Sequence, residues 1–100
     1  MRIFVCSPYR GDIELNTQQA KKYVRDVICK GHTPFAPHLL YTQILDESTD
    51  RETGMELGLD MLTVMDEVWV YGERVTEGMR REINSALSIG IPVRYMGDLT

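Results

Sequence analysis

Short apolar runs alternate with longer helical stretches along this chain, and this alternation constrains the fold more than any other feature. Four runs rich in β-branched or aromatic residues, at 2–6, 32–36, 68–71 and 91–95, are separated by segments with helical periodicity. Connections of that length join parallel strands. The pattern therefore predicts an α/β fold, a doubly wound parallel sheet of four to five strands with helices on both faces.

The connecting segments show where the helices are expected. The first helix is predicted from a capping box at Asn16 and Gln19 to a terminal glycine at Gly31. A short helix at 38–45, a polar break at 46–50 and a helix at 51–65 follow, and Thr76 is predicted to cap the last helix, which runs through Leu87. The side chains expected to face the core are Ala20, Tyr23, Val24, Val27 and Ile28 in the first helix, Met55, Leu59 and Leu62 in the third, and Met79, Ile83, Ala86 and Leu87 in the last.

Composition excludes several classes of protein. With 100 residues, 43% of them hydrophobic, the chain is expected to form one globular domain over residues 1–100. The net charge is −4 and Lys and Arg are not clustered, so no nucleic-acid partner is predicted. No apolar run approaches about 18 residues, so no membrane span is predicted. A core of this size is small, and we expect a homodimer or a higher even oligomer.

The cysteines and the amino terminus bear on the cellular compartment. Cys6 and Cys29 are too few for a disulfide framework and have no metal-ligand spacing. The first residues resemble a strand and contain no signal-peptide pattern. The sequence therefore predicts a cytoplasmic protein with free thiols, without a metal ion or cofactor.

In a doubly wound sheet, ligands bind beyond the carboxyl ends of the strands, which directs attention to residues 7–12 and 72–78. In the first of these loops Ser7 supplies a hydroxyl, Arg10 a guanidinium and Gly11 a backbone that a ligand can approach closely. Together they could bind phosphate or a sugar hydroxyl; the alternative is an ordinary loop with an exposed arginine. His38 follows the second strand and is expected at the mouth of the same crevice, without a metal partner.

Glu82 is the principal candidate for chemistry. At 100° per residue it lies at the edge of the apolar stripe of its helix, next to Met79 and Ala86. A partly buried carboxylate near a crevice has the character of a nucleophile. The alternative is a glutamate that flanks the core and pairs with an arginine.

The strand at 66–71 and the later pattern Gly78-Met79-x-x-Glu82-x-x-x-Ala86-x-x-x-Gly90 resemble the nucleoside 2-deoxyribosyltransferase-like superfamily. Nearly the whole chain is similar to its short, often phage-encoded branch of unknown function. The resemblance implies a flavodoxin-like strand order, with Glu82 as the nucleophile. It also implies that the first loop, including Tyr9, Arg10 and Gly11, binds sugar and phosphate, and that Gly78 lies at the substrate. The sequence of residues 54–58 closely matches a nucleophile motif of some transferases, but this segment precedes the third strand. The nucleophile of the family follows that strand, so Glu82 is preferred to Glu56.

Two further positions follow from the resemblance. Where nucleoside transferases typically have an aspartate that accepts from the 5′-hydroxyl, this chain has Thr76, and related deoxynucleoside 5′-monophosphate N-glycosidases have a serine. A hydroxyl can donate to phosphate, so Thr76 indicates a phosphorylated ligand. The family usually has a second acidic residue, but the corresponding position in this chain is Gly58. Nearby Asp60 is therefore the candidate for protonating the leaving base.

These features predict an enzyme that hydrolyses or transfers at the N-glycosidic bond of a nucleotide or nucleoside, with a 5′-monophosphate preferred. Glu82 would be the nucleophile and Asp60 the acid, and Ser7, Tyr9, Arg10, Gly11, His38, Thr76 and Gly78 would bind substrate. One alternative is a protein that binds or sequesters a nucleotide without turning it over, because the second acid is out of register. Another is an interaction module that binds no nucleotide.

Overall fold

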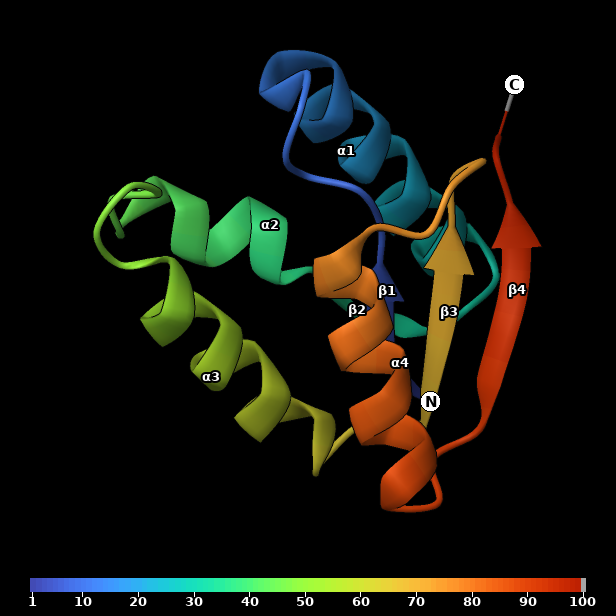
Figure 1. Cartoon of the computed structure of the whole chain (residues 1–100). Coiled ribbons are helices and arrows are strands. Elements are labelled where there is room, and N and C mark those ends of the chain that lie inside the picture. The colour runs from blue at the N-terminus through green and yellow to red at the C-terminus, as the bar shows by residue number, and fades with distance from the viewer. Residues whose placement is uncertain (100) are drawn as a thin grey trace.

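The computed structural model describes residues 1–99 and contains a parallel sheet. Its four strands are β1 (Arg2–Cys6), β2 (Thr33–Phe35), β3 (Glu67–Tyr71) and β4 (Val93–Gly97). They lie side by side in the order β2-β1-β3-β4, and every neighbouring pair is parallel (Figure 1). The predicted doubly wound α/β fold with flavodoxin-like strand order is confirmed.

The helices cover both faces of this sheet. They are α1 (Ile13–Cys29), α2 (Pro37–Leu40) with the 3₁₀ turn η1 (Tyr41–Gln43), α3 (Arg51–Leu62) and α4 (Glu77–Ser88). In Figure 1, α4 crosses in front of the sheet with α3 beside it, whereas α1 lies behind the sheet. This arrangement leaves the loops after β1 and β3 at one end of the molecule, next to α2 and the start of α4.

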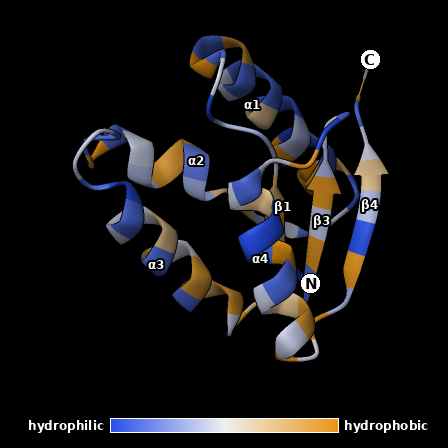
Figure 2. Ribbon diagram, viewed as in Figure 1, coloured by the Kyte–Doolittle hydropathy of each residue, from blue (hydrophilic) through white to orange (hydrophobic). Residues whose placement is uncertain are grey.

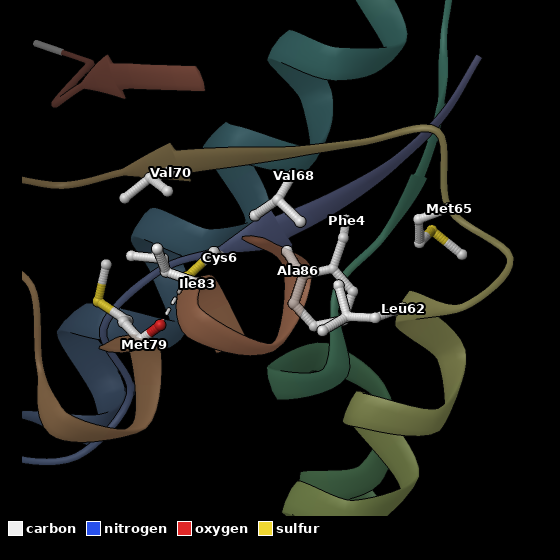
Figure 3. Packing of buried hydrophobic residues seen from close by; sticks show 9 residues of the cluster. All are labelled: Phe4, Cys6, Leu62, Met65, Val68, Val70, Met79, Ile83 and Ala86. Carbon is white, nitrogen blue, oxygen red and sulfur yellow. Dashed lines mark hydrogen bonds between the residues drawn. The ribbon is translucent and has the colours of Figure 1, made fainter. Parts of the chain in front are cut away.

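The core consists of one hydrophobic cluster on each face of the sheet. Alternate residues of β1 enter different clusters: Phe4 and Cys6 pack towards α3 and α4 (Figure 3), whereas Ile3 and Val5 pack towards α1. Figure 2 shows that β3 is largely hydrophobic, as expected for a strand that is covered on both sides. No helix among the described residues is both long enough and apolar enough to span a membrane.

The start of α1 differs from the prediction. The helix begins at Ile13 because the Asp12 side chain caps it, accepting a hydrogen bond from the Leu15 backbone N–H at 3.1 Å. Asn16 therefore lies inside the helix, and its amide bonds the preceding loop instead. Ile28 and Leu87 were predicted to face the core, which is wrong, because they are 56% and 59% exposed.

The start of α4 agrees with the prediction. Thr76 is the N-cap, and its hydroxyl oxygen accepts a hydrogen bond from the Met79 N–H at 3.3 Å. Met79, Ile83 and Ala86 form the buried stripe. The cap fixes where the first turn of α4 begins, and so sets how Glu82, on the second turn, faces the end of β1.

Candidate functional site

A cavity of about 290 Å³ lies beyond the carboxyl end of β1, between the first loop and α4. Its other walls come from α2, η1, the segment 45–50 and the start of α3. Six of the residues predicted from the sequence line it: Tyr9, Arg10, His38, Thr76, Gly78 and Glu82. A second hollow of about 450 Å³, beside Tyr23 and Gly72, is lined by none of the residues predicted for the functional site.

Glu82 is the innermost acid of this cavity. It is only 3% exposed, and its Oε1 atom is buried without a hydrogen-bond partner among the described residues. Burial raises the pKa of Glu82 to about 8, and a hydrogen bond with the Cys6 thiol acts in the opposite direction. Burial also raises the pKa of Cys6, and the adjacent Glu82 carboxylate adds to that effect. The site therefore holds a carboxyl group that is neutral in much of the free protein at neutral pH.

Tyr9 and His38 form an aromatic wall of the cavity. Their rings stack with centroids 4.9 Å apart and an angle of 21° between planes. Burial lowers the pKa of His38 to about 4, although a hydrogen bond with the Ser7 backbone favours the charged form. The imidazole is consequently uncharged near neutral pH, and its stacked pair offers a flat, neutral surface to a ligand.

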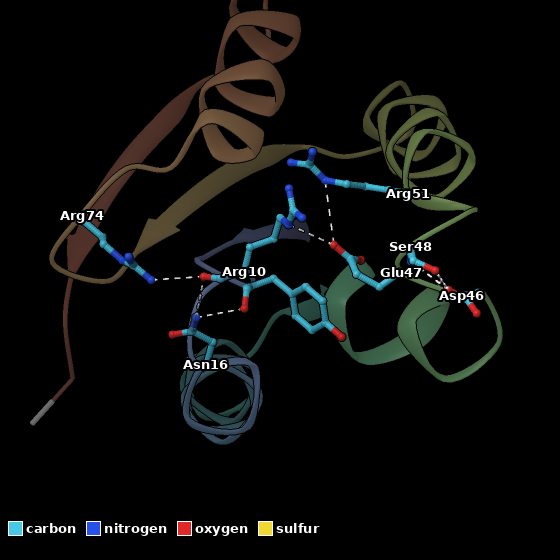
Figure 4. Close-up of polar contacts among 8 residues, drawn as sticks. Arg10, Asn16, Asp46, Glu47, Ser48, Arg51 and Arg74 are labelled. Atoms are coloured by element: carbon cyan, nitrogen blue, oxygen red, sulfur yellow. Dashed lines mark hydrogen bonds and ion pairs between the residues drawn. The ribbon is translucent and has the colours of Figure 1, made fainter.

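The backbone of the first loop is held in place from two sides. The Asn16 amide donates to the carbonyl oxygens of Tyr9 at 2.9 Å and Arg10 at 3.2 Å, and Arg74 Nη2 donates to the Arg10 carbonyl at 3.4 Å (Figure 4). Gly11 adopts a φ of +103°, which side chains other than glycine rarely tolerate. The loop therefore has a fixed backbone from which Arg10 projects.

The Arg10 guanidinium contacts Glu47, a residue that the sequence did not single out. Arg10 Nε lies 3.3 Å from Glu47 Oε1, and Arg51 Nε lies 3.9 Å from the same oxygen (Figure 4). Both Glu47 and Arg51 line the cavity. They come from a polar segment with no motif, and only the fold brings that segment to the first loop.

Three predicted site residues lie outside the cavity lining. Ser7 is 2% exposed at the start of the first loop, where its backbone contacts His38, and Gly11 is exposed within the same loop. Asp60 is exposed on α3. Gly58, two residues earlier, faces Pro37, and two residues turn a helix by about 200°, so Asp60 points away from the cavity. Asp60, predicted to protonate the leaving group, therefore lies outside the cavity that contains Glu82.

The described residues include no group of three His, Cys, Asp or Glu side chains placed to hold a metal ion. The chemical groups that the cavity offers are instead a buried carboxyl, a neutral aromatic wall, two arginines and the capped start of a helix.

Comparison with solved structures places this architecture in the nucleoside 2-deoxyribosyltransferase-like fold, as the sequence predicted. A 2-deoxyribosyltransferase from the psychrotolerant bacterium Bacillus psychrosaccharolyticus superposes with a TM-score of 0.68 and 21% sequence identity, over 97% of this chain and 72% of that one. That enzyme is described as a biocatalyst for the synthesis of antiviral and antitumoral nucleosides. The chain itself belongs to the family described as Domain of unknown function (DUF7768), whose model matches residues 1–96. No curated protein matches its sequence.

Proposed function

We propose that this protein cleaves or transfers at the N-glycosidic bond of a nucleoside or nucleotide, with Glu82 as the nucleophile. The observation that carries the proposal is the Glu82 carboxyl, which is buried, lacks a partner at Oε1 and lines the cavity at the carboxyl end of the sheet. A buried polar atom without a partner is costly unless a ligand uses it. The 2-deoxyribosyltransferase with the same fold supports the choice of reaction.

In the proposed reaction the ionised Glu82 attacks the anomeric carbon and forms a glycosyl ester as the base leaves. Water, or a second base, then attacks that carbon and releases the carboxylate, with net retention of configuration. Positive charge that develops on the sugar in the transition state stabilises the ionised form of Glu82, which burial otherwise disfavours. With Asp60 outside the cavity, we assign protonation of the leaving base to a bound water molecule.

The ligand would be oriented by groups on opposite walls. The stacked rings of Tyr9 and His38 suit the flat face of a base. The Thr76 hydroxyl oxygen already accepts from Met79, so its proton remains free to donate to an oxygen of the 5′ group. Together with Arg10, this supports a preference for a 5′-monophosphate. The acids Asp46, Glu47, Asp50 and Glu77 also line the cavity and oppose a phosphate.

A non-catalytic nucleotide-binding protein is the second candidate. The observation in its favour is the position of Asp60, which leaves Glu82 as the one acid that is buried as a whole residue among those that line the cavity. Such a protein would keep the pocket and bind a nucleotide without breaking its glycosidic bond.

The two candidates are separated by incubating the protein with a panel of nucleosides and their monophosphates and measuring free base by mass spectrometry. The enzyme releases base, and Glu82→Gln abolishes that release while still binding the ligand. Glu56→Gln is the matched control, because Glu56 belongs to the misleading 54–58 motif and is exposed on α3 outside the cavity. Thermal stabilisation by a nucleotide without release of base supports the binding protein. Neither effect with any ligand in the panel overturns both candidates.

A further inference from the structure

The Glu47 carboxylate lies between two arginines at the cavity. Its Oε1 atom is 3.3 Å from Arg10 Nε and 3.9 Å from Arg51 Nε. The two guanidiniums come from different parts of the chain, the loop after β1 and the first residue of α3. All three side chains line the same cavity as Glu82, and Figure 4 shows them converging. Two positive groups that share one carboxylate also have the arrangement that binds a phosphate.

The contact between Glu47 and the arginines is weak. Glu47 Oε1 is buried yet accepts no hydrogen bond among the described residues, so the attraction depends on charge alone. The side chains of Arg10 and Arg51 are 60% and 46% exposed, where solvent screens ion pairs. A ligand oxygen that formed aligned hydrogen bonds with the same guanidiniums would compete favourably with Glu47.

Glu47 is also the acid of its segment that no hydrogen bond among the described residues ties to the turn. Asp46 Oδ1 accepts from the Ser48 N–H at 2.8 Å and from the Ser48 hydroxyl at 2.6 Å, and Asp50 Oδ2 accepts from the Asp46 N–H at 3.0 Å. These bonds fix the turn. Glu47 has no such bond among the described residues, so its side chain can leave the arginines without disturbing the turn around it.

We propose that Glu47 is an internal counter-ion, which the phosphate group of a ligand displaces so that Arg10 and Arg51 bind that phosphate together. This inference deepens the proposed function, on which it rests for the choice of a phosphorylated sugar, and it adds Arg51 and Glu47 to the residues that set specificity. In the free protein Glu47 neutralises the arginines. In the complex it turns outward, and the phosphate takes its place.

The inference is tested by calorimetry with ribose 5-phosphate, with ribose as the uncharged comparison. Removing the competing charge in Glu47→Gln should tighten binding of ribose 5-phosphate by about tenfold and leave ribose unchanged. Glu77→Gln is the matched control, because Glu77 lines the same cavity and forms no ion pair among the described residues. A general electrostatic effect would act equally in both variants, so equal gains would overturn the proposal, as would no gain in Glu47→Gln.

Arg51 provides the second arm of the test. Arg51→Ala should weaken binding of ribose 5-phosphate, and the gain from Glu47→Gln should shrink in the double variant because one guanidinium is missing. Full retention of that gain would show that Arg51 takes no part. Because ribose 5-phosphate has no base, the result does not depend on glycosidic cleavage. Tighter binding in Glu47→Gln with no release of base from any nucleotide would support this inference and refute the proposed enzyme. Failure of ribose 5-phosphate to bind any variant would overturn the inference while leaving an enzyme for nucleosides possible.

Discussion

Glu82 shares the inward face of α4 with Met79, Ile83 and Ala86, where every other side chain is apolar. A hydrophobic residue would stabilise the fold better at this position, because a buried carboxyl with one oxygen unpartnered loses its hydration and gains little in exchange. The Glu82 carboxyl therefore lowers the stability of the fold. This loss of stability grows as pH rises, whereas the loss at His38 grows as pH falls, so the two effects can be measured separately.

We expect Glu82 to make the protein less stable as pH rises. Its folded-state pKa of about 8 lies above the usual 4.5, so its favourable contribution is complete below about pH 4.5 and is lost as pH rises through about 8. Glu82→Gln removes the titration and should flatten this decline, with a gain on the order of a few kcal/mol above pH 8. Thermal unfolding of both proteins between about pH 5 and 9 measures it. Parallel curves would contradict the burial of a titrating carboxyl.

We expect His38 to make the protein less stable as pH falls below about 6.5. Its folded-state pKa of about 4 lies below the usual 6.5, so its contribution is present above about pH 6.5 and is lost as pH falls through about 4. His38→Phe keeps an aromatic ring against Tyr9 but cannot take up a proton. We expect this variant to lose less stability than the unmodified protein between about pH 6.5 and 4, measured by urea unfolding at each pH. An unchanged acid dependence would show that the imidazole is solvated.

At the scale of elements, the two loops of the site support each other directly. A Cβ at Gly72 would lie 3.0 Å from Pro8 Cδ, so the loop after β3 packs against the loop after β1 with no room for a side chain. Gly72 also has a φ of +102°, which favours glycine. The same loop leads into Thr76 and the start of α4, so the position of the cap is linked to the position of the first loop.

Thr76 allows the charge at this helix start to be changed without losing the cap. Aspartate is also a good N-cap, so Thr76→Asp should keep α4 intact and change the melting temperature little. If the 5′ group is a phosphate, the added charge should reverse a preference for a monophosphate over its nucleoside, because like charges meet. Arg10→Ala should weaken that preference without reversing it. Calorimetry with a matched pair of ligands measures both, and equal affinities in the unmodified protein would show that the loop does not recognise phosphate.

How much the sequence could predict depends on the range of the interactions involved. The strands and helices followed from local periodicity, and the Thr76 cap from a local motif. The start of α1 was placed too late because Asn16 and Asp12 are both good capping residues, and only the structure shows that Asn16 bonds the loop. The Glu47–Arg10 contact joins residues 37 positions apart in two segments without motifs, so no local pattern could indicate it.

The whole molecule is small, and its surface retains much apolar area. Twelve large hydrophobic side chains are exposed among the described residues, with Ile44 at 73% and Tyr95 at 67% the most exposed. Met55, Met61 and Met65 do not add to this apolar surface, because Met61 and Met65 pack in the core of this chain and Met55 lies against Gly78. The argument now depends on the exposed side chains and on the modest size of the core.

We therefore expect a homodimer or a higher even oligomer at micromolar concentration, measured by sedimentation velocity. Burying large apolar side chains between two copies stabilises both, and the stabilisation should grow with protein concentration. Ile44→Asp places a charge just after η1, next to the cavity-lining Leu45, and Tyr95→Asp places one on β4. In Figure 1, α2, which directly precedes η1, and β4 lie on opposite sides of the molecule. Whichever charge dissociates the oligomer locates the interface, and the other variant is its control. If the Ile44 variant alone dissociates, the interface adjoins the cavity, and binding of nucleotides should become dependent on protein concentration. A monomer in the unmodified protein at every concentration tested would remove the expectation of an oligomer.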